Sequence, residues 1–452
     1  MPNQLKRRIG PTEALFYGLG VILGAGIYVL VAPAAGFAGN AVWLSFLIAA
    51  TLATFTGLAY AELGSMFPKA AAEYVYVKRA YRSHVYAFML GWMIIFTGVV
   101  SISTVSLGFT GYFSDLLGTS PDQTKYLLPG ISAAMILVMG LVNYVGIKET
   151  SRMNIAMTAL VIVGLLIVIA IGVWSGGFTT TDYFLMPNGL NGVFIAASLI
   201  FFAYLGFEEI VNVAEETRNP RRVLPKAIIL SVVISTILYI LTAMSLVGIE
   251  GWQALAESKA PLADAVQNVF GHNAGLVISV IALVATSSTV LGLILVVSRM
   301  IWGMSREGAL PSIFAHVNRR GTPSRAIIVV MLGAMAFVFL GDIAHVASIT
   351  SIGALFIFLN INLALIWLRY TEPNMHRPFR TPLNIGKYPV MGGLGVFVSM
   401  FMMMQFSFDV FLTGVAVAVV GLAAFIVYKK RDFFMVRQLE SFLRDLRKEA
   451  ER

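Results

Sequence analysis

The amino-acid sequence predicts an all-α integral membrane protein with twelve transmembrane helices, arranged as a five-plus-five inverted repeat in which helices 1 and 6 are discontinuous. The composition excludes a soluble domain, because 58% of the 452 residues are apolar and 12% are charged, whereas soluble domains carry about 25% charged residues. Apolar runs of the length that a hydrocarbon core requires, about 20 residues per helix, recur along the chain. Two of these runs are broken by glycines at corresponding positions of the two halves.

The predicted spans follow one another with short connections. The first repeat, residues 12–175, contains spans 12–38, 41–67, 85–114, 126–146 and 153–175, and the second repeat, residues 190–369, contains spans 190–214, 224–249, 273–303, 325–341 and 344–369. Two more spans, 389–407 and 409–428, complete one domain over residues 1–428. Residues 429–452 alternate apolar and basic residues at helical spacing, which predicts either an amphipathic helix on the inner leaflet or a solvated tail.

The distribution of basic residues predicts that both termini lie in the cytoplasm. With the N-terminus inside, all 32 Lys and Arg residues except Lys125 and Lys259 fall on the cytoplasmic side or at its helix ends. Cytoplasmic loops are enriched in these residues, and the bias sets the orientation. The net charge of +9 therefore indicates a multi-pass protein of the cytoplasmic membrane in contact with anionic lipid head groups, and no nucleic-acid partner.

The two glycine-broken runs read GLGVILGAGI at residues 18–27 and FFAYLGFEE at residues 201–209. A helix break at membrane depth is tolerated only where the backbone lines a cavity or is buried in protein. A pair of such breaks in the two halves of a chain indicates a binding site near the bilayer midplane, of the kind found in secondary transporters. Helix 1 starts inside and helix 6 starts outside, so the breaks and the topology together predict the inverted repeat and the movement of a small zwitterion.

Several local sequences resemble the amino acid–polyamine–organocation transporter superfamily. The resemblance is carried by GAGIY at 24–28, AYAELGSMFP at 59–68, EYVY at 73–76, FAYLGFE at 202–208, EETRNP at 215–220, LPKAI at 224–228, SREGALP at 305–311 and RPFRTP at 377–382. These segments cover nearly the whole chain in order. The resemblance implies the leucine-transporter type of fold, with an amino acid substrate held between helices 1 and 6 and moved by alternating access.

The resemblance also implies roles for residues at the two breaks. The amides of Ala25 and Gly26 would hold the substrate carboxylate, because helix N-termini favour anions. The carbonyls of Ile22, Phe202 and Leu205 would hold the substrate ammonium.

Gly24 and Gly26 would allow close approach of the substrate, and Gly206 would supply the break in helix 6. Phe202 occupies the position of the family's aromatic gate, with Ala203 beside it, and Leu293 corresponds to a more distal position of the pocket. The alternative interpretations are close helix packing through small residues and, for Phe202, an ordinary core or lipid-facing ring.

Two glutamates within the predicted spans are candidate proton sites, because ionisable residues inside a membrane are functional by default. Glu208 follows the break in helix 6, and Glu62 lies in helix 2. Each could instead satisfy freed polar groups as a structural strut, an interpretation that we favour for Glu62 and consider equally probable for Glu208. Glu209, Glu215 and Glu216 lie nearer the cytoplasmic end and are expected to be gate or loop residues.

The sequence departs from its relatives at Val161, where many of them carry a lysine on helix 5. Coupling through such a lysine is therefore not expected, which leaves exchange, facilitated diffusion or sodium symport. The carbonyls of Gly20 and Leu23 with the hydroxyls of Ser288 and Thr289 would form an oxygen-only site suited to sodium. Hydroxyl groups in a span more often bond to their own helix or a neighbour. No cofactor is expected apart from Na⁺ or H⁺ as a coupling ion.

The expected function is secondary transport of an amino acid, and membrane lipids are the other expected partners. A neutral amino acid is favoured because the sequence places no evident Asp or Glu at the end of the site that holds the substrate's side chain. The alternatives are a polyamine or cationic amine transporter and a non-transporting amino acid sensor. An enzyme is not expected, because the chain shows no nucleophile–base pair and no metal-ligand spacing, with five scattered His residues and no Cys.

Overall fold

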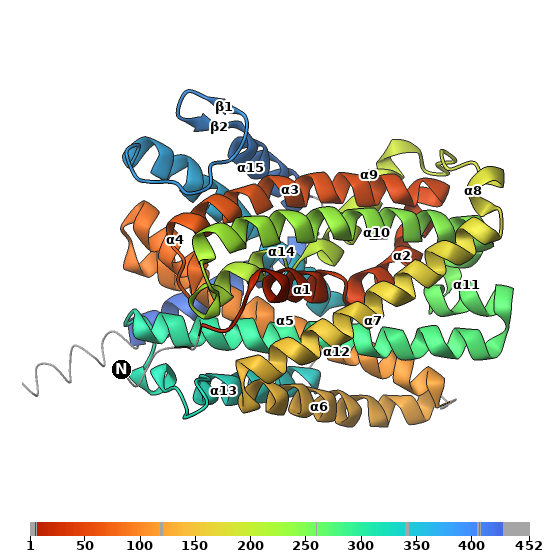
Figure 1. Cartoon of the computed structure of the whole chain (residues 1–452), viewed down its shortest axis with the longest axis horizontal. Coiled ribbons are helices and arrows are strands. Elements are labelled where there is room, and N and C mark those ends of the chain that lie inside the picture. The colour runs from red at the N-terminus through yellow and green to blue at the C-terminus, as the bar shows by residue number, and fades with distance from the viewer. Residues whose placement is uncertain are drawn as a thin grey trace, which may run out of the picture.

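The structure is a computed structural model that describes residues 5, 7–117, 121–258, 260–339, 343–404, 406 and 408–427. Nearly all of these residues are helical (Figure 1). The predicted C-terminal amphipathic segment, residues 429–452, lies outside the described residues.

Helices follow one another along both halves of the chain. The first half contains α1 (Pro11–Ile22), α2 (Ala25–Ala38), η1 (Gly39–Ala41), α3 (Val42–Met66), α4 (Ala72–Tyr81), α5 (His84–Leu116), α6 (Pro121–Val145), α7 (Ile147–Trp174) and α8 (Gly177–Thr180). The second half contains α9 (Gly189–Ile200), η2 (Phe201–Tyr204), η3 (Glu208–Glu216), α10 (Pro220–Glu257), α11 (Pro261–Phe270), α12 (His272–Arg306), η4 (Ser312–Ala315), α13 (Ser324–Val338) and α14 (Ile343–Thr371). A hairpin of β1 (Asn384–Ile385) and β2 (Tyr388–Pro389) precedes α15 (Val390–Met403) and a helix over Phe408–Val427.

Among the described residues, eight helical segments are long and apolar enough to cross a membrane. They are Pro11–Met66, His84–Thr110, Ile147–Trp174, Gly189–Glu216, Pro220–Glu257, His272–Arg306, Thr350–Thr371 and Phe408–Val427. Three shorter apolar helices accompany them: Pro129–Val145, Ser324–Val338 and Val390–Met403. The chain is therefore a helical membrane protein with several spans, as its composition predicts.

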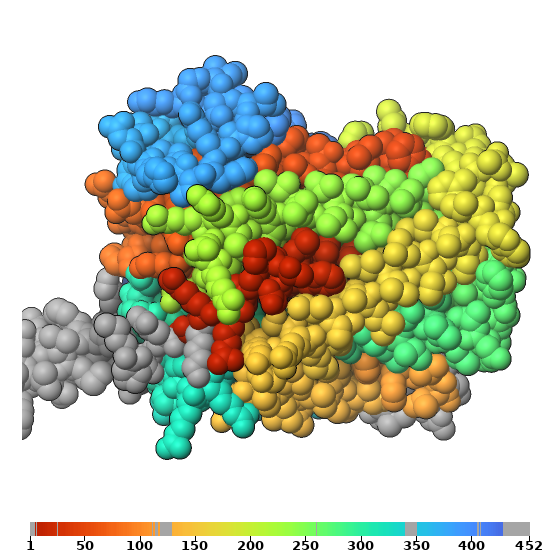
Figure 2. Space-filling model, in the orientation of Figure 1, coloured from red at the N-terminus to blue at the C-terminus, as the bar shows by residue number. Residues whose placement is uncertain are grey.

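The helices around the two breaks form the centre of the bundle. Helix α1 packs between α7 and α10 (Figures 1 and 2), and α2 packs on α9. Helix α12 is buried along nearly its whole second half and packs on α5. Large exposed apolar side chains, such as Leu141, Val163, Ile237, Leu332 and Phe397, lie on the outer helices, where lipid and not water is their solvent.

A buried ion pair fastens α3 to α14. The carboxylate of Glu62 accepts hydrogen bonds from Arg369 Nε at 2.7 Å and Nη2 at 2.6 Å, and from the Thr381 amide at 2.8 Å. Arg377 Nε lies 3.2 Å from the same carboxylate. Because all the groups that bind Glu62 are polar or cationic and the side chain is fully buried, the structure favours the strut interpretation of this residue.

A second buried pair joins α12 to the end of η3. Arg299 donates to both carboxylate oxygens of Glu216 at 3.1 and 3.0 Å, and both side chains are fully buried. The carbonyl of Glu216 accepts the amides of Arg8 and Ile9 at 2.8 and 2.9 Å, and the Arg218 amide donates to the Ile9 carbonyl. The N-terminal segment is therefore held to the end of η3 by backbone hydrogen bonds.

We predict that Glu62→Gln destabilises the protein strongly, because two buried guanidinium groups lose their counter-charge. Breaking a buried pair on one side costs roughly 3–5 kcal/mol. Thermal unfolding of the detergent-purified protein measures the effect, with exposed Glu257→Gln as the matched control. Equal melting temperatures for the two variants would show that the cluster contributes nothing to stability.

Candidate functional site

Both predicted breaks are present in the backbone. Helix α1 ends at Ile22 and α2 begins at Ala25, so Leu23 and Gly24 are not helical. In the second half, η2 ends at Tyr204, and Leu205 is extended with φ −61° and ψ 135°. Gly206 follows with φ +130°, a conformation that glycine adopts without steric cost. Each break leaves backbone amides and carbonyls without a partner in their own helix.

The two breaks pack directly against each other. A Cβ atom added to Gly26 would lie 2.5 Å from the Cα of Ala203, and one added to Gly206 would lie 2.6 Å from Cγ1 of Val21. The hydroxyl of Tyr239, on α10, lies within hydrogen-bond distance of the Ile22 carbonyl and, at 3.1 Å, of the Ala203 carbonyl. The hydroxyl of Tyr239 therefore contacts a backbone carbonyl at each of the two breaks.

A cavity of about 70 Å³ lies beside this contact. The predicted site residues that line it are Ile22, Gly26, Phe202, Ala203, Leu205, Gly206, Leu293, Glu208 and Thr289. Gly24, which directly precedes α2, is not among the described residues that line it. Gly24 instead lies against Thr289, with no room for a Cβ atom between them, so close helix packing explains this glycine.

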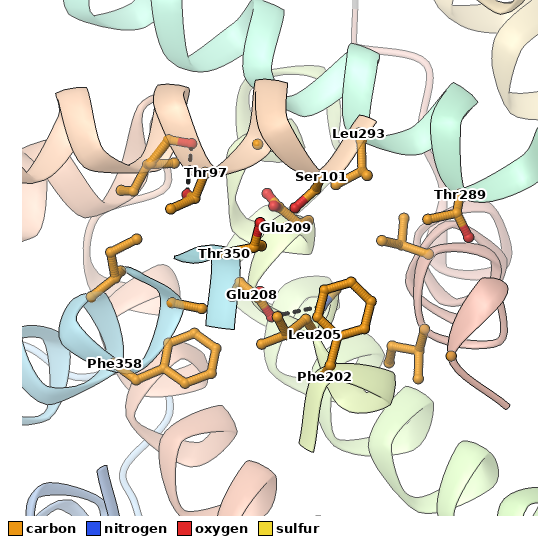
Figure 3. A pocket seen from close by; sticks show the side chains of 18 of the residues that line it. Thr97, Ser101, Phe202, Leu205, Glu208, Glu209, Thr289, Leu293, Thr350 and Phe358 are labelled. Carbon is orange, nitrogen blue, oxygen red and sulfur yellow. Dashed lines mark hydrogen bonds between the residues drawn. The ribbon is translucent and has the colours of Figure 1, made fainter. Parts of the chain in front are cut away.

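The opposite wall carries residues that the sequence did not single out. Figure 3 shows Thr97 and Ser101 of α5 and Thr350 of α14 near Glu208 and Glu209, while Phe202 lies on the other side of the two glutamates. Helices α5 and α14 could not be assigned to the cavity from the sequence, because hydroxyl residues are common in membrane spans.

The cavity wall also contains acidic residues. The sequence places no evident Asp or Glu at the end of the site that would hold the substrate's side chain, and that expectation stays a prediction. Glu73, Glu208 and Glu209 all line the cavity. Glu73 comes from α4, which connects two spans, and Glu209 was expected to lie near the cytoplasmic end. Both Glu208 and Glu209 follow the break at Leu205 and Gly206 and line the wall.

These three glutamates have different partners. Glu208 Oε2 accepts the Gly206 amide at 2.8 Å and so satisfies a backbone group that the break frees. Glu73 accepts Asn212 Nδ2 at 3.1 and 3.3 Å, and Asn212 Oδ1 accepts the Ala72 amide. Burial raises the pKa of Glu73 to about 7, although hydrogen bonds from its own amide and from Asn212 oppose the rise. Glu209 Oε2 is buried and has no partner among the described residues.

The residues of the possible sodium site have other partners. Ser288 Oγ accepts Asn154 Nδ2 at 3.3 Å, and Gly20 lies against the Asn154 and Thr158 side chains. Thr289 Oγ1 donates to the Ala285 carbonyl at 3.3 Å. Leu23 is buried, as is Val161 on α7. The structure thus brings Gly20 and Ser288 together around Asn154, while Thr289 faces Gly24 and the cavity.

The fold and the cavity define a multi-pass membrane transporter built around two broken helices. A family model described as amino acid permease matches residues 9–428, and the chain therefore belongs to the amino acid permease family. This family consists of transporters and not of enzymes.

Three relatives of this chain are named for different substrates. The chain is 30% identical over 452 residues to the branched-chain amino acid permease BcaP of Bacillus subtilis (strain 168), covering 95% of this chain and 94% of that protein. It is 29% identical over 448 residues to the methylthioribose transporter of the same organism, covering 95% of each chain. It is 28% identical over 393 residues to the vacuolar cationic amino acid transporter 4 of Arabidopsis thaliana, covering 82% of this chain and 65% of that protein.

We predict that Gly26→Ala weakens amino acid binding, because the added methyl must displace the backbone of Ala203. Overpacking of this kind costs about 1–3 kcal/mol, and the same free energy lost from binding would lower the affinity roughly five- to 150-fold. Gly36→Ala, also in α2, is the matched control, since its Cβ would lie 3.5 Å from Ala256 in ordinary contact. Ligand-induced thermal shifts measure both variants, and equal shifts would place the substrate away from this contact.

Proposed function

We propose that the protein transports an amino acid with a neutral side chain across the cytoplasmic membrane by alternating access. The observation that carries the proposal is the contact of the two helix breaks beside a cavity that their backbone lines. A substrate there would replace the partners that both broken helices lack. Membership of the amino acid permease family supports the same function.

The substrate's two charged ends would bind the backbone. The first amides of α2, at Ala25 and Gly26, would hold the carboxylate, because a helix N-terminus carries unpaired donors and a partial positive charge. The carbonyls of Ile22, Phe202 and Leu205 would hold the ammonium. Tyr239 and the Leu205 amide already bond to the first two of these carbonyls, but each carbonyl oxygen has a second lone pair.

The substrate's side chain would lie against the apolar part of the wall. Ile94 and Val105 of α5, Leu293 of α12 and Ile357 and Phe358 of α14 line this part of the cavity. Such a surface suits an aliphatic side chain, and one relative is named as a branched-chain amino acid permease. A cationic amino acid is the second candidate, because Glu209 presents an unpartnered carboxylate oxygen and another relative is named as a cationic amino acid transporter.

The complete topology is part of the proposal. The break between α1 and α2 and the break between η2 and η3 would occupy equivalent places in repeats 12–175 and 190–369. With α15 and the helix over Phe408–Val427 added, twelve crossings would leave both termini in the cytoplasm, as the distribution of basic residues requires.

Proteoliposomes containing the purified protein test the function. Radiolabelled leucine and lysine should be offered against vesicles that are preloaded with unlabelled amino acid, and uptake should then be driven separately by a sodium gradient and by a pH gradient. Leucine counterflow that unlabelled lysine does not inhibit would support a neutral substrate. Sodium-driven uptake that is lost in Ser288→Ala/Thr289→Ala would support the possible sodium site. No counterflow with any amino acid would contradict the proposed function.

We predict that Phe202→Ala reduces leucine uptake at least tenfold, because the ring borders the cavity and would cover the bound substrate. Phe202→Tyr should retain part of the activity, since it keeps the ring. Phe194→Ala, at an exposed position of α9, controls for the loss of a phenyl group. If Phe202→Ala and Phe202→Tyr transport equally, the ring contributes only packing.

A further inference from the structure

A second cavity shares no lining residue with the cavity beside the helix breaks. It has a volume of about 440 Å³, against about 70 Å³ for the first. Its walls come from three segments that are distant in the sequence: the N-terminal segment, the end of α6 with the start of α7, and the turn between η4 and α13. These segments meet at the surface of the bundle (Figure 2). The second cavity is therefore separate from the one proposed to hold the amino acid.

Positive charge dominates this second cavity. Arg8, Lys148, Arg319 and Arg320 line it together with one carboxylate, Glu149, so that four cations and one anion leave a net charge of +3. None of the four cations forms an ion pair with another described residue. The carboxylate of Glu149 instead lies over the start of α7. Like charges gathered around one cavity repel one another, and an anion that enters the cavity relieves the repulsion.

Other basic clusters of the protein are neutralised by acidic side chains. Lys69 and Lys78 pair with Glu307 at 3.2 and 2.9 Å, and Arg306 pairs with Glu215 at 3.1 Å. An excess of basic residues on one side of the membrane sets the orientation of a membrane protein, but it does not require unpaired cations to converge on one cavity. The second cavity thus lacks the counter-charge that these clusters have.

Hydrogen bonds fix the backbone that carries the cations. The amide of Arg8 donates to a carbonyl at the end of η3 at 2.8 Å. In the turn before α13, Asn318 Oδ1 accepts the amides of Arg320 and Thr322 at 2.9 and 3.1 Å. Thr322 Oγ1 donates at 3.2 Å to the carbonyl of Tyr144, near the end of α6. Only the long side chains therefore have to be ordered when an anion binds, which limits the entropic cost.

The second cavity also borders a surface that faces lipid. Val145 lines the cavity and is 41% exposed. Leu141 and Tyr144 precede it on α6 at helical spacing and are exposed on the same face. Tyrosine is typical of the membrane–water interface. A lipid whose acyl chains lie along this face of α6 places its head group at the cavity.

We propose that the second cavity binds the phosphate of an anionic lipid head group. Arg8, Lys148, Arg319 and Arg320 donate to the phosphate oxygens, and guanidinium groups suit this role because they can donate two parallel hydrogen bonds to one phosphate. Basic pockets between transmembrane helices bind anionic head groups in this way. The bound head group joins the N-terminal segment to α7 and to the turn before α13. This binding site goes beyond the proposed transport function and does not depend on it.

Native mass spectrometry of the full-length protein in detergent tests the site. The wild-type protein should bind one phosphatidylglycerol about tenfold or more tightly than phosphatidylcholine, and Arg319→Gln/Arg320→Gln should lose this preference. The matched control is Arg221→Gln/Arg222→Gln, an adjacent exposed pair at the start of α10 that does not line the cavity. The control removes the same charge and should leave the preference unchanged.

Two results would overturn the proposal. Equal losses in the two double variants would reduce lipid binding to an effect of general surface charge. Displacement of the lipid by an equal concentration of glycerol 1-phosphate would assign the cavity to a soluble phosphate.

A second measurement applies if Arg319→Gln/Arg320→Gln does not fold. Phosphatidylglycerol should raise the melting temperature of the wild-type protein, because the head group joins three segments, and Lys148→Gln should reduce this rise. Lys226→Gln, at an exposed position of α10, should keep it. The same rise in both single variants would contradict binding at the second cavity.

Discussion

The contact between the two helix breaks is the constraint on which the rest of the structure depends. A membrane offers no water to the amides and carbonyls that a break frees, so each break must find its partners in the protein or in a ligand. Gly26 lies against Ala203, Gly206 lies against Val21, and neither glycine leaves room for a methyl group. Tyr239 bonds to carbonyls of both segments. Residues of both breaks line the cavity, which is why the binding site is expected there.

The buried charges divide into two kinds according to their partners. Glu62 with Arg369 and Glu216 with Arg299 are paired at short distances, and both pairs join helices that are distant in sequence. Glu209, beside the cavity, has an oxygen without any partner. An unpaired carboxylate in this environment costs free energy, so Glu209 differs in kind from the paired residues. The paired residues suit a structural role.

The sequence predicts the breaks well because glycine is the residue that a break requires. Gly24 and Gly206 therefore lie at the observed breaks. A buried glutamate such as Glu62 can be expected to pair with a cationic side chain, here Arg369. The facing side chains are harder to predict. Tyr239 lies in an apolar helix that carries no motif, and its role appears only when α10 packs on α1. Glu209 was expected to be a gate or loop residue nearer the cytoplasmic end, whereas it lines the cavity shortly after the break at Leu205 and Gly206. Sodium binding at Ser288 and Thr289 stays a prediction.

The end of the bundle that contains the N-terminal segment combines contacts of unequal strength. The N-terminal segment, η3 and α12 are held together by backbone hydrogen bonds and a fully buried ion pair. Helix α4 is joined to the end of α12 by Lys78 and Glu307, a pair that is partly exposed and therefore contributes little. Burial raises the pKa of Glu307, but hydrogen bonds from Lys78 and Lys69 outweigh it and lower the pKa, so this pair persists near neutral pH. Burial raises the pKa of Glu73 on α4, and its protonated form stabilises the fold at low pH and loses this contribution as the pH rises toward 7. Deprotonation of Glu73 therefore weakens the packing of α4 beside the cavity, while the ion pair between Lys78 and Glu307 stays charged.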